Sequence, residues 1–266
     1  MIDTVGKVFR ITKVFLGYSL QKAMAYRVNF FFLYLAVLVQ SVGEVILLNV
    51  VLNQIDSVMG WGVYEILIVM GFAKIIEGIA WMVYRGGLMD FSENIRTGDI
   101  DNILLKPLDL QFLISIENFA FEETSGVIAG IVFVVVGVVG SETVLSVENV
   151  LGAILALSVG MVFHYVFRLV YSTVAIFTTA LERATVLDVK FFELGRYPVQ
   201  IFPRIVSKFL TYVIPIAFVG TIPAEMIVWG LDLKMVITGL VIEIVLLVGA
   251  RSFLKWALRK YEGVGK

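Results

Sequence analysis

Residues 28–50 form the stretch that decides the fold, and they read VNFFFLYLAVLVQSVGEVILLNV. Glu44 is the only charged residue in it. A helix that crosses a membrane needs about 20 mostly apolar residues, so this stretch predicts a membrane span. Four similar stretches predict further spans at 62–84, 118–140, 150–178 and 234–256. A shorter and more polar one at 184–198, which carries Asp188, Lys190, Glu193 and Arg196, predicts another between the last two of these.

The composition of the whole chain agrees with a membrane location. Of the 266 residues, 59% are hydrophobic and 16% are charged, whereas soluble domains average about 45–50% and about 25%. We therefore expect an all-α polytopic membrane protein with six transmembrane helices in one membrane domain. Lys and Arg number 21 against 22 Asp and Glu, which argues against a nucleic-acid partner. With no Cys and one His, no metal site is expected.

Lys and Arg also indicate the sides of the membrane. The loops at 51–61 and 141–149 contain neither residue, whereas 1–27, 85–111 and the C-terminal tail contain many. By the positive-inside rule both termini are cytoplasmic. Residues 1–27 alternate apolar and basic side chains at helical spacing, which predicts an amphipathic helix on the inner leaflet rather than an ordinary cytoplasmic helix. Residues 28–266 then form the six-span domain.

The stretch at 85–111, here called the polar segment, predicts a short cytoplasmic helix. Gly98 can end one helix in the left-handed conformation, Asp99 can cap the next, and Pro107 stops it. One side of this short helix is apolar and carries Ile100, Ile103 and Leu104. We interpret that side as a docking surface for a partner protein; the alternative is that it packs on helix ends of its own chain.

Four of the five prolines fall within one apolar stretch. They are Pro198, Pro203, Pro215 and Pro223. A regular span cannot hold four prolines without breaking, but broken helices are tolerated at membrane depth where protein buries them. We therefore predict a re-entrant hairpin on the outer side at 198–228, here called the proline hairpin. The alternative, a single kinked span, would place the basic C-terminal tail outside.

Charged side chains within the spans are costly and mark candidate functional positions. Lys74 and Glu77 lie three residues apart, so we expect them to pair, and Glu243 is a second partner within reach of Lys74. We also expect Arg168, four residues after His164, to pair with Glu122 or Glu123. For each of these charges, the sequence leaves two roles open: a structural ion pair or a contact with the substrate. The full set is Glu44, Lys74, Glu77, Glu122, Glu123, His164, Arg168 and Glu243.

Motifs for chemistry are absent from the sequence. It contains no G-x-x-x-x-G-K-[ST] loop, so we do not expect this chain to hydrolyse ATP. It also lacks H-E-x-x-H and G-x-S-x-G. No catalytic residue is therefore predicted, and the chain is not expected to be an enzyme.

The polar segment and the proline hairpin both resemble the ABC-2-type permease family, the membrane subunits of ATP-driven exporters. The cytoplasmic pattern of that family is matched by Arg96, Gly98, Ile100, Asp101, Lys106, Pro107 and Leu108. One departure is Ile103, which stands where the family usually has Leu. The outer pattern is matched by Arg196, Tyr197, Pro198, Phe202, Pro203, Leu210, Thr211, Ile214, Pro215, Ala217, Phe218, Val219, Pro223 and Ala224.

The resemblance implies a function and partners. It implies a permease dimer, identical or paired with a sister chain, above two ABC ATPase subunits that bind ATP and Mg, with no cofactor in this chain. The substrate path would follow the dimer interface in a prokaryotic inner membrane. It makes the short helix a coupling helix seated in the ATPase, through Arg96, Gly98, Asp99, Asp101, Lys106 and Pro107. It makes Arg196, Tyr197, Pro198, Pro203, Pro215 and Pro223 parts of an outer gate.

Two other readings of the sequence are weighed against this one. A stand-alone secondary carrier would use the charges in the spans for ion coupling, but it would need inverted repeats, which we do not find. A membrane scaffold that transports nothing is the other. The substrate class is left open among lipid, peptide, drug and glycan.

Overall fold

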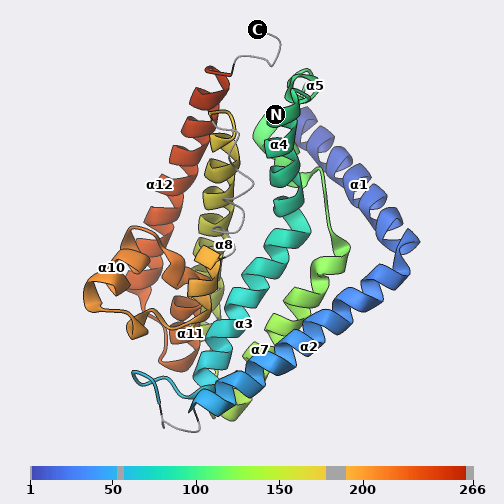
Figure 1. Cartoon of the computed structure of the whole chain (residues 1–266). Helices are drawn as coiled ribbons and strands as arrows, with labels where there is room; N and C mark the ends of the chain where they lie inside the picture. The colour runs from blue at the N-terminus through green and yellow to red at the C-terminus, as the bar shows by residue number, and fades with distance from the viewer. Residues whose placement is uncertain (1, 53–56, 178–189, 262–266) are drawn as a thin grey trace.

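The computed structural model describes residues 2–52, 57–177 and 190–261, and within these ranges it is helical, with no β-strand. Five of the helices are long and apolar enough to cross a membrane (Figure 1). They are Arg27–Leu52, Val63–Thr97, Phe121–Gly140, Val147–Val174 and Leu233–Leu258. These correspond to the predicted spans at 28–50, 62–84, 118–140, 150–178 and 234–256, which confirms an all-helical, multi-pass membrane protein.

The predicted span at 184–198 lies partly outside the described residues. Its described part begins as a helix at 190–193 and continues into a 3-10 turn, η3 (Leu194–Arg196). This part alone is too short to cross a membrane.

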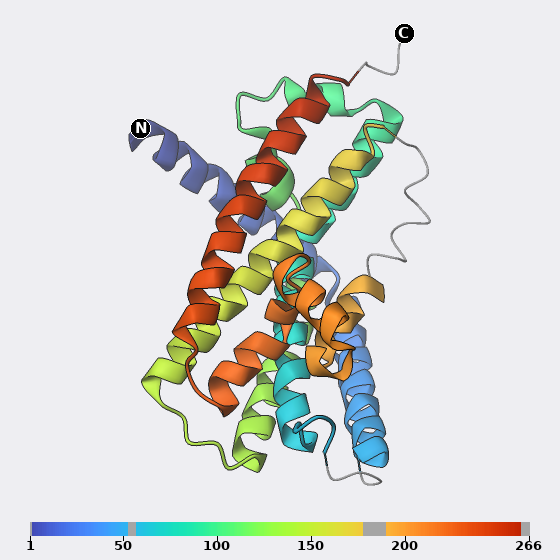
Figure 2. The same cartoon turned by 90° about the vertical axis from the view of Figure 1, so that its left-hand side faces the viewer.

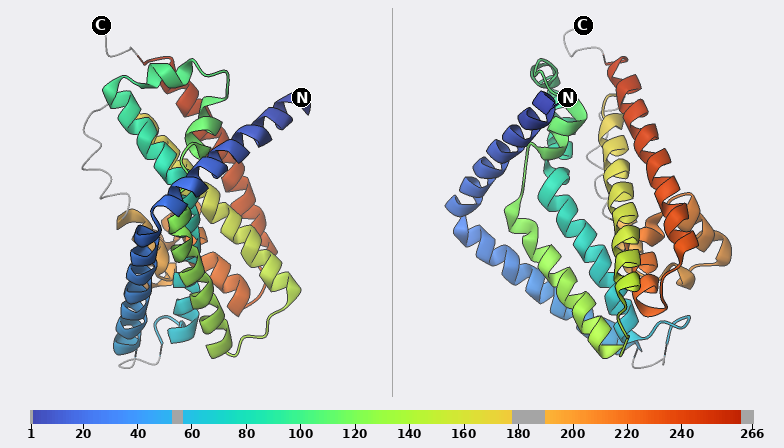
Figure 3. Two further views of the ribbon diagram at one scale, coloured as in Figure 1. Left: turned by 90° about the vertical axis from the view of Figure 1, so that its right-hand side faces the viewer. Right: turned by 180° about the vertical axis from the view of Figure 1, so that it is seen from behind.

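The chain begins with helix α1 (Ile2–Ala25), which covers the predicted N-terminal helix. It meets α2 (Arg27–Leu52) at a bend at Tyr26. Figure 1 shows the two helices diverging from this elbow like the arms of a V, and the rear view in Figure 3 shows the same. Of the residues in α2, only Ser41 and Leu52 are buried.

The second span is longer than the sequence predicts. Helix α3 (Val63–Ala80) continues through one π-helical turn, η1 (Trp81–Arg85), directly into α4 (Gly86–Thr97). The helix does not end at 84, because Gly86 and Gly87 keep helical geometry and let another backbone approach. A Cβ on Gly87 would overlap the carbonyl oxygen of Ile114, so the glycine is required by this packing.

The polar segment contains the short helix α5 (Ile100–Leu104) and leads into a second one, α6 (Leu110–Ile116). Gly98 ends α4 with a left-handed φ of 85°, and α5 ends before Pro107. Asp99 stands at the N-cap position of α5, but the prediction that its side chain caps the helix is wrong. Its carboxylate instead accepts a hydrogen bond from the hydroxyl of Thr97 at 2.7 Å. Asp109 makes a side-chain cap, on α6.

The third span consists of a 3-10 turn, η2 (Phe121–Glu123), and helix α7 (Thr124–Gly140). It packs against α3 at very short range. A Cβ on Gly130 would lie 2.7 Å from the carbonyl oxygen of Gly71, and one on Gly71 would lie 2.8 Å from that of Gly130. Small residues at such crossings are the usual means of close helix association in membranes.

Helix α8 (Val147–Val174) begins at Ser146, whose hydroxyl accepts a hydrogen bond from the backbone nitrogen of Asn149. The proline hairpin is broken into short helices: η4 (Val199–Ile201), α10 (Arg204–Tyr212), η5 (Ile216–Val219) and α11 (Thr221–Val228). Each of its prolines directly precedes one of these helices or lies in its first turn, where a missing N–H costs nothing. Helix α12 (Leu233–Leu258) follows.

The two predicted regions lie toward opposite ends of the bundle. Figures 1 and 2 show α5 at the same end as the start of α1 and the end of α12, whereas α11 lies toward the opposite end, where α2 ends. Residues 215–224, from Pro215 to Ala224, are all buried. The apolar side chains among them, such as Ile216, Phe218 and Ile222, belong to the main core with α3 and α8. The broken backbone is therefore covered by protein, as it must be away from water.

Candidate functional site

The polar segment presents one exposed face at its end of the molecule. Ile100 and Ile103 of α5 are both buried, and Ile100 belongs to a core cluster with parts of α4, α8 and α12. The interpretation of the apolar side as a docking surface is therefore wrong for these two residues, which pack on their own chain. Leu104 is 44% exposed and Leu105 is 82% exposed.

The exposed face is amphipathic. Beside the two leucines it carries exposed polar and charged side chains and one proline, namely Asp101, Asn102, Lys106 and Pro107. Exposed leucine side chains next to an acidic and a basic side chain are typical of a surface that binds a protein partner.

Three ion pairs involve the polar segment, one within it and two with residues outside it. Arg96 pairs with Glu93 one turn earlier on α4, and Lys106 Nζ lies 3.0 Å from Glu117. The guanidinium of Arg251, on α12, lies 2.8 Å from the carboxylate of Asp109. Of the predicted site residues, Arg96 and Lys106 therefore have partners within the chain, and the sequence did not identify Arg251 as one that holds this segment.

A second set of contacts ties α6 to α8. The hydroxyl of Tyr165 lies 2.8 Å from that of Ser115 and 3.1 Å from the amide nitrogen of Gln111. The phenol of Tyr261, at the end of α12, has a raised pKa because burial, and then the nearby charge of Asp101, disfavours the phenolate. The segment is thus held by contacts with α8 and α12.

Four of the predicted site charges meet in one place, although not in the predicted pairs. Lys74 Nζ lies 2.9 Å from Glu44 Oε2, close enough for an ion pair but without hydrogen-bond angles. Arg196 lies 2.7 Å from Glu77 and 3.4 Å from Glu44. We call these four residues the charge network.

The charge network joins three parts of the chain that are distant in sequence. Glu44 comes from α2, Lys74 and Glu77 come from α3, and Arg196 ends η3. Two cations and two anions balance, and all four side chains are at least about 70% covered, with relative exposures of 7% to 27%. Removal of any one of the four side chains would leave an uncompensated charge in an apolar environment and would therefore destabilise the fold.

Three predicted pairings are wrong. Lys74 does not pair with Glu77, because each finds a partner on another element. Lys74 does not reach Glu243 either, and within the described ranges Glu243 forms no salt bridge. Nor does Arg168 form one with Glu122 or Glu123 in the described structure. Its guanidinium lies 5.8 Å from the ring centre of Phe192.

His164 is buried between two aromatic side chains. Its Nδ1 lies 2.9 Å from the hydroxyl of Tyr84, and its ring centre lies 4.0 Å from that of Phe192. The π-helical turn places the guanidinium of Arg85 3.3 Å from the ring centre of Trp81. This geometry is typical of a packed core that positions α4 on α8.

The proline hairpin is closed by a hydrogen bond between its two ends. The backbone nitrogen of Val199, next to Pro198, donates to the buried hydroxyl of Thr221 at 3.1 Å, two residues before Pro223. Pro215 is buried, whereas Tyr197 is 48% exposed and Pro203 is exposed. The predicted hairpin residues thus include both buried supports and exposed positions.

The sequence analysis missed one acidic residue of the hairpin. Glu225, on α11, accepts a hydrogen bond from the side chain of Gln200. Burial raises its pKa to about 7, with a further rise from the charge of Asp232. The signal was present: Glu225 is the only carboxylate in the apolar stretch 215–230, but the proline pattern alone guided the prediction.

A family model described as "ABC-2 family transporter protein" matches residues 38–265. The match covers the charge network, the polar segment and the proline hairpin, and it begins within α2. Comparisons with curated proteins and with solved structures gave no match.

Proposed function

The chain belongs to the ABC-2 family of transporter proteins, and on that premise we propose that it is the permease subunit of an ATP-driven exporter. Permeases of this family typically lack ATPase activity, so a separate ATPase subunit supplies the energy. We further propose six spans with both termini in the cytoplasm of a prokaryote, and a dimer with an identical or sister permease whose interface forms the substrate path.

The observation that carries the proposal is the continuous helix from Val63 to Thr97. Near its middle it bears Lys74 and Glu77, the α3 members of the charge network. At its far end it stops at Gly98, directly before α5. A displacement of α5 would therefore be transmitted to the charge network through one unbroken helix. The π-helical turn η1 is the point where the helical register changes.

In the proposed mechanism the ATPase binds the exposed face of α5. ATP closes the ATPase dimer, and the resulting movement of α5 is passed to α3. The ion pairs of the charge network hold α2 and η3 to α3 in one conformation and break in the other. Arg196, which stands directly before Tyr197 and Pro198, links this change to the proline hairpin. Binding energy at one end thus biases a membrane domain with two arrangements.

The test is a co-purification with an ATPase subunit encoded beside this chain. Asp101→Lys reverses an exposed charge on α5 without touching the core, and we expect it to abolish co-purification and substrate-stimulated ATP hydrolysis. Glu142→Lys, an exposed charge reversal in the loop after α7, is the matched control and should leave both unchanged. A variant Asp101→Lys that still binds and stimulates the ATPase would contradict the coupling assignment. Ion-dependent uptake by the chain alone would favour a secondary carrier.

A further inference from the structure

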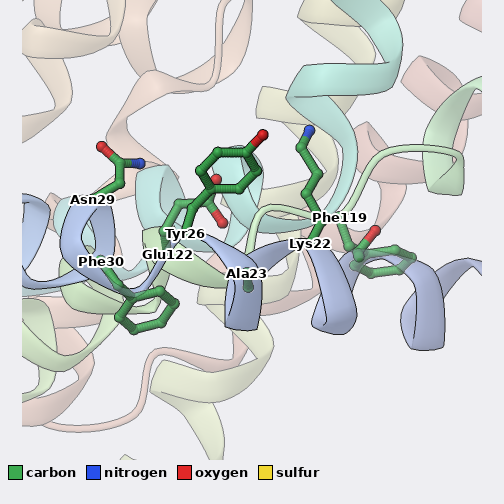
Figure 4. A pocket seen from close by; sticks show the side chains of 8 residues that line it. Lys22, Ala23, Tyr26, Asn29, Phe30, Phe119 and Glu122 are labelled. Carbon is green, nitrogen blue, oxygen red and sulfur yellow. The ribbon is translucent and has the colours of Figure 1, made fainter.

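We propose that a cleft at the elbow between α1 and α2 binds the head group of a phospholipid that carries both a phosphate and a primary ammonium group. The cleft has a volume of about 210 Å³ and is lined by residues from the end of α1, the start of α2, the stretch before η2 and η2 itself. Figure 4 shows the side chains that line it. This inference is independent of the proposed function.

One wall of the cleft is aromatic and fixed in place. Phe30 and Phe119 line it from α2 and from the stretch before η2. The ring of Phe30 stacks on that of Tyr34 with centres 5.1 Å apart. Tyr34 in turn shares a 2.6 Å hydrogen bond with Thr124 at the start of α7. The wall is therefore set by contacts between α2 and α7 before any ligand arrives, which lowers the cost of binding.

The polar lining carries one charge of each sign. Lys22 comes from the last turn of α1 and Glu122 from η2. Within the described residues neither forms a salt bridge with the other or with a third group, although both line one cleft. In Figure 4 the carboxylate of Glu122 lies beside Tyr26, and Tyr26 and Asn29 point to the same side as Lys22.

This lining matches the two charges of a zwitterionic head group. The ammonium of Lys22, with the hydroxyl of Tyr26 and the amide of Asn29 as further donors, suits a phosphate. Glu122 suits a primary ammonium, which also gains from aromatic faces such as those of Phe30 and Phe119. A purely anionic head group would bring a second negative charge close to Glu122 and bind less well.

The position of the cleft favours a lipid as the source of this head group. Arg27 stands at the elbow, and the long apolar helix α2 begins there. Basic and aromatic side chains at the start of a span lie at the level of the lipid head groups. In the proposed topology the elbow lies at the inner surface of the membrane, where phospholipid head groups are the most concentrated solute.

The test is native mass spectrometry of the full-length chain released from mixed vesicles of phosphatidylethanolamine and phosphatidylglycerol. We expect wild type to retain phosphatidylethanolamine roughly fivefold to tenfold more than phosphatidylglycerol, as for one hydrogen bond of ordinary net strength. Glu122→Gln should remove this preference, and Lys22→Gln should lower retention of both lipids. Lys13→Gln and Glu142→Gln are exposed control substitutions outside the cleft, and both should behave as wild type.

Two results would overturn the inference. The first is equal retention of the two lipids by wild type, which needs no variant and so does not depend on how a variant folds. The second is a preference that survives in Glu122→Gln. A further experiment adds soluble phosphoethanolamine to wild type. If phosphoethanolamine binds while wild type retains no phosphatidylethanolamine, the natural occupant is a free solute and the lipid assignment is wrong.

Discussion

The guanidinium of Arg196 lies 2.7 Å from the carboxylate of Glu77, although 119 residues separate them. Arg196 also lies 3.4 Å from Glu44, and Glu44 lies 2.9 Å from Lys74. Because α2 buries only Ser41 and Leu52 of its own, these ion pairs are its main polar connection to α3 and η3.

Charge balance predicts how substitutions in the network combine. Arg196→Gln leaves Glu77 without a partner, and Glu77→Gln leaves Arg196 in excess, so each single variant unbalances the set by one charge. The double variant is neutral again and keeps the Glu44–Lys74 pair. We expect it to melt at a higher temperature than either single variant, whose losses should stay below the roughly 3–5 kcal/mol of a fully buried broken pair.

Thermal unfolding in detergent measures this prediction. Lys190→Gln serves as a control, since its pair with Glu193 is exposed and such pairs contribute little. Losses that simply add in the double variant would show that Arg196 and Glu77 do not act together.

The sequence allowed prediction of the network's members but not of its pairings. Lys74 and Glu77 lie three apart, which places them on one face of a helix and favours a local pair. Spacing along one helix contains no information about which other element lies opposite that face. Here α2 supplies Glu44, 2.9 Å from Lys74, and η3 supplies Arg196, 2.7 Å from Glu77.

The sequence predicted some helix ends correctly and others not. Gly98 and the four prolines act through their own backbone, so their effects on helix ends were readable from the sequence. Gly86 and Gly87 were not, because their role depends on the carbonyl of Ile114 and therefore on tertiary packing. The burial of Ile100 likewise depends on tertiary packing against α8 and α12.

The packing of α3 on α7 predicts that Gly130→Ala is destabilising. The added methyl group would lie 2.7 Å from the carbonyl oxygen of Gly71, and backbone on both helices would have to move. Overpacking of this kind costs about 1–3 kcal/mol. Gly249→Ala on α12 is the matched control, because nothing lies within 4 Å of its Cβ position. It should leave the melting temperature unchanged or raise it, since Ala is the better helix former.

The two sides of α5 should respond differently to substitution. Ile100→Ala removes a fully buried side chain and should lower the free energy of unfolding by about 2–5 kcal/mol. Leu105→Ser changes a side chain that is 82% exposed, so its effect on unfolding should stay within about 0.5 kcal/mol. In the complex, Leu105→Ser should nevertheless weaken ATPase binding. Equal binding by wild type and Leu105→Ser would place the docking surface elsewhere.

Glu225 predicts a pH dependence of stability that resides in the proline hairpin. Burial raises its pKa from 4.5 to about 7, so the fold favours the protonated acid. The unfavourable contribution of the charged form is therefore absent below the unfolded pKa, grows as the pH rises between the two values, and is complete above about 7. The charge of Asp232 acts in the same direction, and the side chain of Gln200 opposes it by donating to the carboxylate.

Glu225→Gln keeps the shape and hydrogen-bonding capacity of the protonated acid and cannot ionise. We expect the variant to melt above wild type at about pH 8, with the gap closing near pH 5 because wild type is then protonated in the folded state. Thermal unfolding of both proteins across this range, in the same detergent, measures the gap. Melting curves that stay parallel from low to high pH would mean that Glu225 titrates at its ordinary value. A gap that widens at low pH would have the opposite sign and require that the fold stabilise the carboxylate.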